Sequence, residues 1–194
     1  MGVRNVLIEG VSGSGKTAVC TELLRRGHEA IHGDRALANQ GDPETGEPVT
    51  DAELAARGPF GGRHRPGCDC PACLDWADRH WIWDLDLVRS LAGDHRQPVT
   101  FFCGGSRNLA KIIELFDAVF VLDADLETLL RRLARRPEHE FGGRQADRDF
   151  LAGRYRTRAD RILDRRLPED RIVINTGRPL DQVVDDILRR SLPA

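Results

Sequence analysis

The chain of 194 residues is long enough for one domain with a three-layer core, and 40% hydrophobic and 31% charged residues are typical of a soluble globular protein. A net charge of −2 gives no overall attraction to nucleic acid or to an anionic membrane. No apolar run approaches the ~20 residues of a membrane span, and the N-terminus lacks a signal-peptide pattern. We therefore expect a cytoplasmic protein whose five cysteines are reduced thiols or metal ligands.

Short apolar runs alternate with helical patterns along the chain. Strands are predicted over residues 3–9, 29–32, 99–103, 118–122 and 171–174. Helices are predicted over residues 15–26, 74–91, 108–116 and 147–166, after a cap at Asp125, and after Pro179. This alternation predicts a doubly wound, five-stranded, mostly parallel sheet with helices on both faces. Ligands in such sheets bind at the carboxyl ends of the strands.

A phosphate-binding loop follows the first predicted strand. The sequence "GVSGSGKT" matches G-x-x-x-x-G-K-[ST] in full, between an apolar strand and a helix. The glycines let several N–H groups point at one anion, the lysine reaches the β- and γ-phosphates, and the threonine hydroxyl ligates Mg²⁺. The predicted ATP-binding residues are Gly10, Ser12, Gly13, Ser14, Gly15, Lys16 and Thr17.

Four segments resemble the small-molecule and nucleotide kinases of the P-loop superfamily, namely the adenylate, shikimate, gluconate and adenylylsulfate kinases. They are the loop at 10–17, "IHGDRAL" at 31–37, "FFCGGSRN" at 101–108 and "VFVLDADLETLLRRLARR" at 119–136. The resemblance covers most of the chain and matches no single member. It implies a three-layer P-loop NTPase fold with an acceptor-binding insertion over residues 38–80 and a lid over residues 136–148.

The resemblance also assigns roles to residues after the second and third strands. Asp34 would orient or deprotonate the acceptor hydroxyl, or hold a Mg²⁺-bound water, although an aspartate there also suits a helix cap. Gly104, Gly105 and Arg107 would bind the acceptor, with the Arg107 guanidinium on a phosphate or carboxylate, although a surface arginine is the alternative.

One residue departs from the adenylate-kinase pattern. Cys103 stands where that family carries an aspartate, and a thiol is a poor partner for Mg²⁺. Besides Thr17, the carboxylates that are candidates for positioning the metal are Asp34, Glu9 and Asp123, of which Asp34 is favoured.

The predicted lid is rich in arginine. Arg136 and Arg144 flank its glycine-containing loop, and we expect them to close over the phosphates during phosphoryl transfer. The alternative is a salt-bridged surface helix. The segment 175–178 after the fifth strand occupies the position where these kinases hold adenine.

The insertion contains a cysteine cluster. Cys68, Cys70 and Cys73, with His64 or His80, offer the ligands of a tetrahedral zinc site, which would order a segment that buries little apolar surface. The spacing C-x-C-x₂-C has no second C-x-x-C pair, so free thiols are the alternative.

The sequence thus predicts an enzyme that transfers phosphate from ATP, with Mg²⁺, to a small hydroxylated metabolite, nucleoside or nucleotide. The alternative is a nucleotide-binding regulatory ATPase whose insertion contacts a protein or RNA partner. Nucleic acid and membranes are not expected as partners of the kinase, which would be a monomer or homodimer. The motifs name neither the acceptor nor a preference for ATP over GTP.

Overall fold

The computed structural model describes residues 4–50, 68–157 and 167–192. Its main sheet has five strands in the order β2-β5-β1-β6-β7, and every neighbouring pair is parallel. The strands are β1 (Arg4–Glu9), β2 (Glu29–His32), β5 (Val99–Cys103), β6 (Ala118–Asp123) and β7 (Ile172–Asn175). All five predicted strands and the predicted parallel sheet are therefore confirmed.

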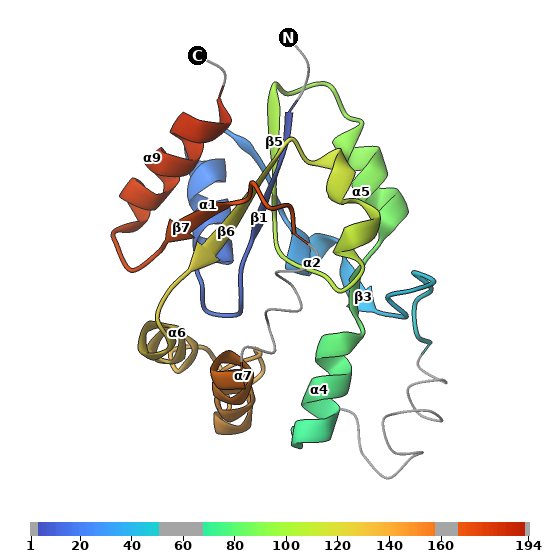
Figure 1. Ribbon diagram of the computed structural model, residues 1–194, viewed down its shortest axis with the longest axis vertical. Coiled ribbons are helices and arrows are strands. Elements are labelled where there is room, and N and C mark those ends of the chain that lie inside the picture. The colour runs from blue at the N-terminus through green and yellow to red at the C-terminus, as the bar shows by residue number, and fades with distance from the viewer. Residues whose placement is uncertain (1–3, 51–67, 158–166, 193–194) are drawn as a thin grey trace.

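Helices cover both faces of this sheet (Figure 1). On one face, α1 (Lys16–Arg25) and α9 (Leu180–Ser191) bury apolar side chains against the strands. On the other face lie α5 (Leu85–Ala92) and two 3₁₀ turns, η1 (Leu109–Lys111) and η2 (Ile113–Leu115). The central strand β1 is buried on both sides because its Val6, Leu7 and Ile8 alternate between the two layers. The three-layer fold predicted from the sequence is confirmed.

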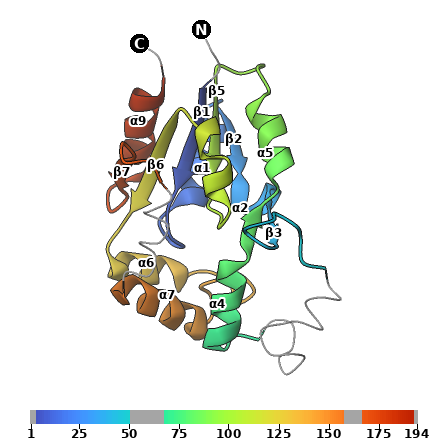
Figure 2. The ribbon, with the colours of Figure 1, turned by 45° about the vertical axis from the view of Figure 1, so that its right-hand side comes forward.

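A further group of helices lies beyond the carboxyl ends of the strands. These are α2 (Gly33–Ala36), α4 (Pro71–Arg79), α6 (Leu126–Leu133) and α7 (Gln145–Thr157). Figures 1 and 2 show α6, α7 and α4 side by side at that end of the sheet, and α7 contacts both of the others. The arrangement encloses the edge of the sheet where the phosphate loop emerges.

The helix predicted over residues 74–91 is wrong in its middle. Helix α4 ends at Arg79, and the short strand β4 (Trp81–Trp83) pairs antiparallel with β3 (Ala38–Gln40) before α5 begins. The Asn108 side chain accepts a hydrogen bond from the Trp83 N–H at 3.0 Å and donates one to the Trp83 carbonyl at 2.8 Å. The extended backbone at Trp83 therefore finds partners far away in sequence, which the helical periodicity could not indicate.

Two other predicted helices differ in their ends or in their type, and one begins as predicted. The stretch 108–116 forms the two 3₁₀ turns instead of one α-helix. Asp125 caps α6 as predicted, because its carboxylate accepts a hydrogen bond from the Thr128 N–H at 2.8 Å. Helix α7 begins at Gln145, and the predicted continuation over residues 158–166 lies outside the described residues.

Within the described part of the chain, no helix is long and apolar enough to cross a membrane.

Candidate active site

The phosphate loop connects β1 to α1 at the carboxyl edge of the sheet. Gly13 and Gly15 have φ angles of 87° and 109°, in the left-handed region that favours glycine. A Cβ atom at Gly10 would lie 2.6 Å from the Leu122 carbonyl oxygen, so that position also tolerates no side chain. Because the loop ends at the N-terminus of α1, it presents N–H groups and a positive helix end to the same space. The fit to a phosphate group is therefore built into the backbone.

Lys16 and Asp34 face each other across the mouth of this loop. The Lys16 ammonium donates hydrogen bonds to the Gly10 carbonyl at 2.5 Å, and its Nζ lies 3.7 Å from Asp34 Oδ2. The other oxygen of Asp34 accepts a hydrogen bond from the Gly105 N–H at 3.0 Å. Asp34 lies in the first turn of α2, but its side chain makes no capping bond and turns to the site instead. Strands β1, β2 and β5 thus deliver their functional residues to one point.

Gly104 and Gly105 allow this close approach. A Cβ on Gly105 would lie 2.7 Å from Glu9 Oε1, and one on Gly104 would lie 2.7 Å from Asp34 Oδ1. Glu9 is buried, and burial raises its pKa while the nearby Lys16 charge opposes that rise. Because Gly104 and Gly105 carry no side chain, the Asp34 and Glu9 carboxyl groups can approach the main chain after β5 closely.

Cys103 points away from the site, into the layer under α1. It is buried beside Cys20 in the same apolar cluster. Burial, with a hydrogen bond that its S–H donates to Cys20, raises the pKa of the Cys103 thiol well above its usual range, so it stays neutral. The residue at the position of the adenylate-kinase aspartate is accordingly a core side chain here. The carboxyl groups that interact with Lys16 are those of Asp34, at 3.7 Å, and of Glu9, whose pKa the Lys16 charge lowers.

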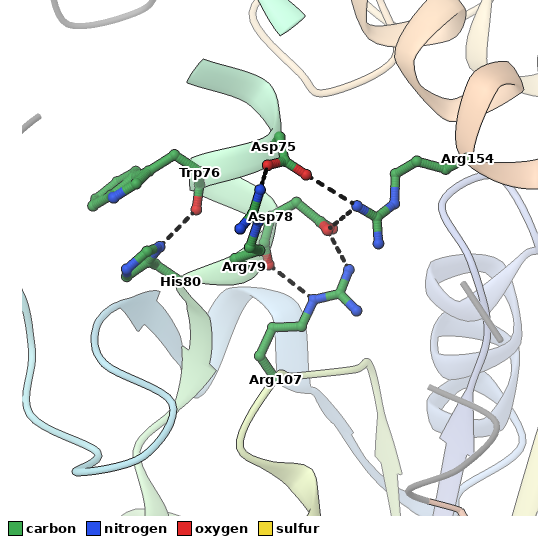
Figure 3. A network of polar contacts seen from close by, with 7 residues as sticks. All are labelled: Asp75, Trp76, Asp78, Arg79, His80, Arg107 and Arg154. Atoms are coloured by element: carbon green, nitrogen blue, oxygen red, sulfur yellow. Dashed lines mark hydrogen bonds and ion pairs between the residues drawn. The ribbon is translucent and has the colours of Figure 1, made fainter. Parts of the chain in front are cut away.

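Arg107 is held by a carboxylate of the protein itself. Its Nε donates to the Asp78 carbonyl at 2.9 Å, and its guanidinium forms an ion pair with the Asp78 carboxylate. Arg154 of α7 reaches the same carboxylate at 3.2 Å and Asp75 at 3.4 Å (Figure 3). Arg107 lines the same small cavity as Asp34, and its binding of an acceptor stays a prediction. Its partners on α4 and α7 were missed. The only sequence signal was the i,i+3 spacing of the two acids on one helix.

Arg136 and Arg144, the two arginines predicted to close over the phosphates, differ in their position relative to the cavities. Arg136 lines the main cavity and donates to the Phe141 carbonyl at 2.7 Å. Arg144 lies 3.6 Å from Asp69 and 3.7 Å from Asp147, and it lines neither of the two cavities described below. The pair chosen from the sequence is thus separated, with only Arg136 at the cavity wall.

Arg132 is the arginine that the sequence reasoning missed. Its guanidinium donates to the carbonyl oxygens of Gly13 at 3.2 Å and Ser14 at 3.4 Å, and to the Thr176 carbonyl at 2.6 Å. Burial lowers its pKa, but a guanidinium remains charged throughout the physiological range. Arg132 therefore ties the phosphate loop to the segment after β7.

Two adjoining cavities occupy this region. The larger has a volume of about 1130 Å³ and is lined by the phosphate loop, Arg132, Arg136, Thr176 and Arg178. Thr17 is exposed and lines it too, which leaves its hydroxyl accessible to a ligand. The smaller hollow, of about 120 Å³, lies between Asp34 and Asp78. The segment after β7 therefore contributes to the wall of the larger cavity.

The three cysteines of the insertion come together at the start of α4. The Sγ atoms of Cys68, Cys70 and Cys73 all lie within 4.8 Å of one another, and no disulfide forms among the five cysteines. His80 stands apart, because its ring stacks on Trp76 at 4.3 Å and its Nδ1 bonds the Trp76 carbonyl at 2.8 Å (Figure 3). His64 lies outside the described residues.

Neither a known protein family nor a characterised protein sequence matches the chain. Solved structures do. Shikimate kinase from Bacteroides thetaiotaomicron is 14% identical, with a TM-score of 0.56 over 96% of this chain and 97% of that one. The chain has the shikimate-kinase fold. Shikimate kinase from Acinetobacter baumannii, solved in complex with shikimate, is 18% identical, with a TM-score of 0.53 over 98% and 96% of the two chains. A Thermus thermophilus protein, TT1252, matches over 100% of both chains at 17% identity and a TM-score of 0.57.

The shikimate-kinase fold agrees with the resemblance that the four sequence segments carry. The likeness extends over nearly the whole of each compared chain. At these identities the likeness describes the backbone, and the chemistry of the acceptor has to be argued from the side chains of this chain.

Proposed function

We propose that this protein is an ATP-dependent phosphotransferase that acts on a small hydroxylated acceptor. The observation that carries the proposal is the position of the Asp34 carboxylate, 3.7 Å from Lys16 and opposite the phosphate loop. A phosphoryl transfer needs a bound triphosphate and an acceptor hydroxyl that is held in line with it. A carboxylate beside the lysine of the loop serves the second need.

On this proposal the loop residues bind the triphosphate. The glycine backbone contacts the phosphates, Lys16 leaves the Gly10 carbonyl for the phosphate oxygens, and Arg136 approaches from the lid region. The cavity fits a magnesium ion as well, since the accessible Thr17 hydroxyl and the Asp34 carboxylate are oxygen ligands of the type that Mg²⁺ prefers. When bound, the ion neutralises charge on the phosphates.

Asp34 acts on the acceptor. The Gly105 N–H holds one of its oxygens, which fixes the carboxylate and leaves the other oxygen toward the cavity. That oxygen accepts the proton of the acceptor hydroxyl or orients it. We further propose that residues 38–80 read the acceptor and that residues 136–148 close over the phosphates, because α4 and Arg136 line the cavity from those two segments.

Two substitutions test the proposal in an ATP-consumption screen of sugars, polyols and nucleosides. Asp34→Asn should reduce acceptor-dependent ADP formation by about 100-fold or more while ATP-analogue binding persists. Lys16→Ala should reduce both. The exposed Asp86→Asn on α5 is the matched control and should leave both unchanged. Full acceptor-dependent turnover by Lys16→Ala, or ADP formation that no acceptor changes, would contradict the proposal.

The cysteine cluster supports a structural zinc ion. Three thiolates bound to one zinc at about 2.3 Å lie ~3.8 Å apart, so Cys68, Cys70 and Cys73 need only a small contraction to bind one ion. We propose that this ion orders the start of α4. Elemental analysis of zinc-loaded, desalted protein should find one zinc per chain, and Cys70→Ser should lose it while Cys20→Ala retains it. Zinc-free wild type after loading would refute the site.

A further inference from the structure

Two arginines from different parts of the fold pair with one carboxylate beside the smaller hollow, which we call the acceptor hollow. Arg107 follows β5, Arg154 lies on α7, and both pair with Asp78 of α4 (Figure 3). The arginine side chains are only 12% and 16% exposed, and Asp78 is 29% exposed. A pair of guanidinium groups around one carboxylate is a typical receptor for a carboxylate or a phosphate. In this protein the receptor already contains an acid of the chain.

The charges around the hollow are therefore balanced before any acceptor enters. Arg107 and Arg154 are matched by Asp78 and by Asp75, which lies 3.4 Å from Arg154. Asp75 also pairs with Arg79, an exposed residue that does not line the hollow. Lys16 belongs to the phosphate loop, and the carboxylate of Asp34 also lines the hollow. An anionic acceptor would have to displace Asp78 from two arginines, or lie unpaired near Asp34 and a triphosphate. Both routes cost free energy, because like charges repel and a separated, partly buried ion pair leaves uncompensated charge.

The rest of the lining suits an uncharged molecule with an apolar face. Trp81, Phe141 and Phe150 line the hollow together with the charged residues, and the Arg154 guanidinium lies 5.5 Å from the centre of the Phe150 ring. Aromatic side chains pack against the faces of sugar rings and bases while the hydroxyl groups bond to polar partners.

Resting on the kinase activity proposed above, we propose that the acceptor is uncharged, a sugar, polyol or nucleoside, and that Asp78 is the built-in anion that excludes acidic acceptors. The Asp78 carboxylate occupies the two-arginine position where an acidic acceptor would otherwise bind. Nucleotides and sugar acids are therefore poor acceptors. Asp78 acts as a specificity-determining residue and takes no part in proton transfer.

Besides Arg136, the exposed Arg35 is a cation near Asp34 that an anion could use. It lies one residue further along α2 and lines the larger cavity but not the hollow. An Arg35→Ala variant therefore separates the two positions, since it should leave the preference for uncharged acceptors unchanged.

A binding experiment tests the inference without any turnover. The full chain is saturated with a nonhydrolysable ATP analogue and Mg²⁺, so that the phosphate loop is filled, and melted in sulfate or in chloride of equal ionic strength. The wild type and the control Asp86→Asn should show the same small difference between the two salts. Asp78→Asn should gain an additional, saturable sulfate-dependent rise in Tm, and Asp78→Asn with Arg107→Ala should lose it. Saturable sulfate binding by the wild type that Arg107→Ala removes would overturn the inference, as would an Asp78→Asn variant that gains none.

A turnover experiment with matched acceptors completes the test. The pairs are glucose with gluconate, ribose with ribose 5-phosphate, and adenosine with its 5′-monophosphate. The uncharged member should have the higher kcat/KM by about tenfold or more, which corresponds to ~1.4 kcal/mol, and Asp78→Asn should shrink that ratio. A faster acidic member in the wild type would overturn the inference. Absence of turnover with every compound would count against the kinase proposal alone, since the sulfate measurement still decides the charge class.

Discussion

Gly104 separates Asp34 from Trp83, and replacing it with alanine tests how rigidly the site is built. The added Cβ would lie 2.7 Å from Asp34 Oδ1, 2.7 Å from Trp83 Cζ2 and 2.9 Å from the Asp34 main-chain nitrogen. Unstrained contacts to a carbon atom are about 3.5 Å or longer. Gly104 is not among the glycines with positive φ, so the cost comes from overlap rather than from backbone strain.

The two neighbours of Gly104 differ in their freedom to move. Trp83 is fully buried, and Asn108 holds both its N–H and its carbonyl, so the indole has no space to retreat. Asp34 is partly exposed and moves instead. Overpacking of this kind costs about 1–3 kcal/mol of folding free energy. A carboxylate displaced by about 1 Å from its working position lowers the rate by about 100-fold.

Urea denaturation and steady-state kinetics measure the two effects of Gly104→Ala. We expect a lower denaturation midpoint and a lower kcat for the best acceptor of the screen, with binding of the ATP analogue nearly unchanged. Gly153→Ala is the matched control, because Gly153 is an exposed residue within α7 and its added Cβ would meet no atom within 4 Å apart from its chain neighbours and the backbone of its own helix. That variant should be more stable than wild type by about 0.5–1 kcal/mol. A Gly104→Ala protein with wild-type stability and kcat would refute the rigid contact between Gly104, Trp83 and Asp34.

Two further predictions concern arginine contacts away from the acceptor. Arg132→Lys should weaken ATP-analogue binding in calorimetry by about tenfold, because one ammonium cannot replace the planar fork that bonds both the phosphate loop and Thr176; unchanged affinity would contradict this role. Asp186 accepts hydrogen bonds from three arginines of the α9 region, Arg178 first among them, which hold its pKa below the ordinary range. The stability that this carboxylate contributes is complete above its ordinary pKa of about 4 and is lost as pH falls through its depressed pKa. Asp186→Asn should therefore lower the free energy of unfolding at pH 7 by about 1 kcal/mol, and with it Tm. A plot of Tm against pH should also fall less steeply on the acid side for this variant than for the wild type; parallel plots would contradict the role of Asp186.

The sheet was predictable because each strand is a short apolar run with its own boundaries. β1 is buried on both faces and ends at the first glycine of a motif that requires a strand before it. The segment 74–91 was not predictable in the same way. Its apolar residues fit a helix, yet Trp81–Trp83 is extended, because β3 pairs with it and Asn108, far along the chain, bonds both the N–H and the carbonyl of Trp83.

The candidate site divides along the same line. The positions of the phosphate loop and of Asp34 could be predicted because each lies directly after the end of a strand that the sequence indicates. Arg132 and Arg154 could not, since each lies in a stretch with several arginines and only the packing of its helix shows which one faces the site. Arg144 flanks the glycine-containing loop, which is why it was predicted to lie over the phosphates, but its guanidinium pairs with Asp69 and Asp147.

The chain uses lysine and arginine for different tasks at this site. It has only two lysines, Lys16 and Lys111, and one of them is the lysine of the phosphate loop. That position needs a slim, mobile point charge, which holds a carbonyl at rest and can move to a phosphate. Arg132 instead holds carbonyl oxygens of two segments at once, and Arg107 holds the carbonyl and the carboxylate of Asp78, as a planar fork does well. Because these arginines are committed to carbonyls and to Asp78, the arginine-rich character of the segment does not make the acceptor hollow a site for anions. The basic sequence and an uncharged acceptor are therefore compatible.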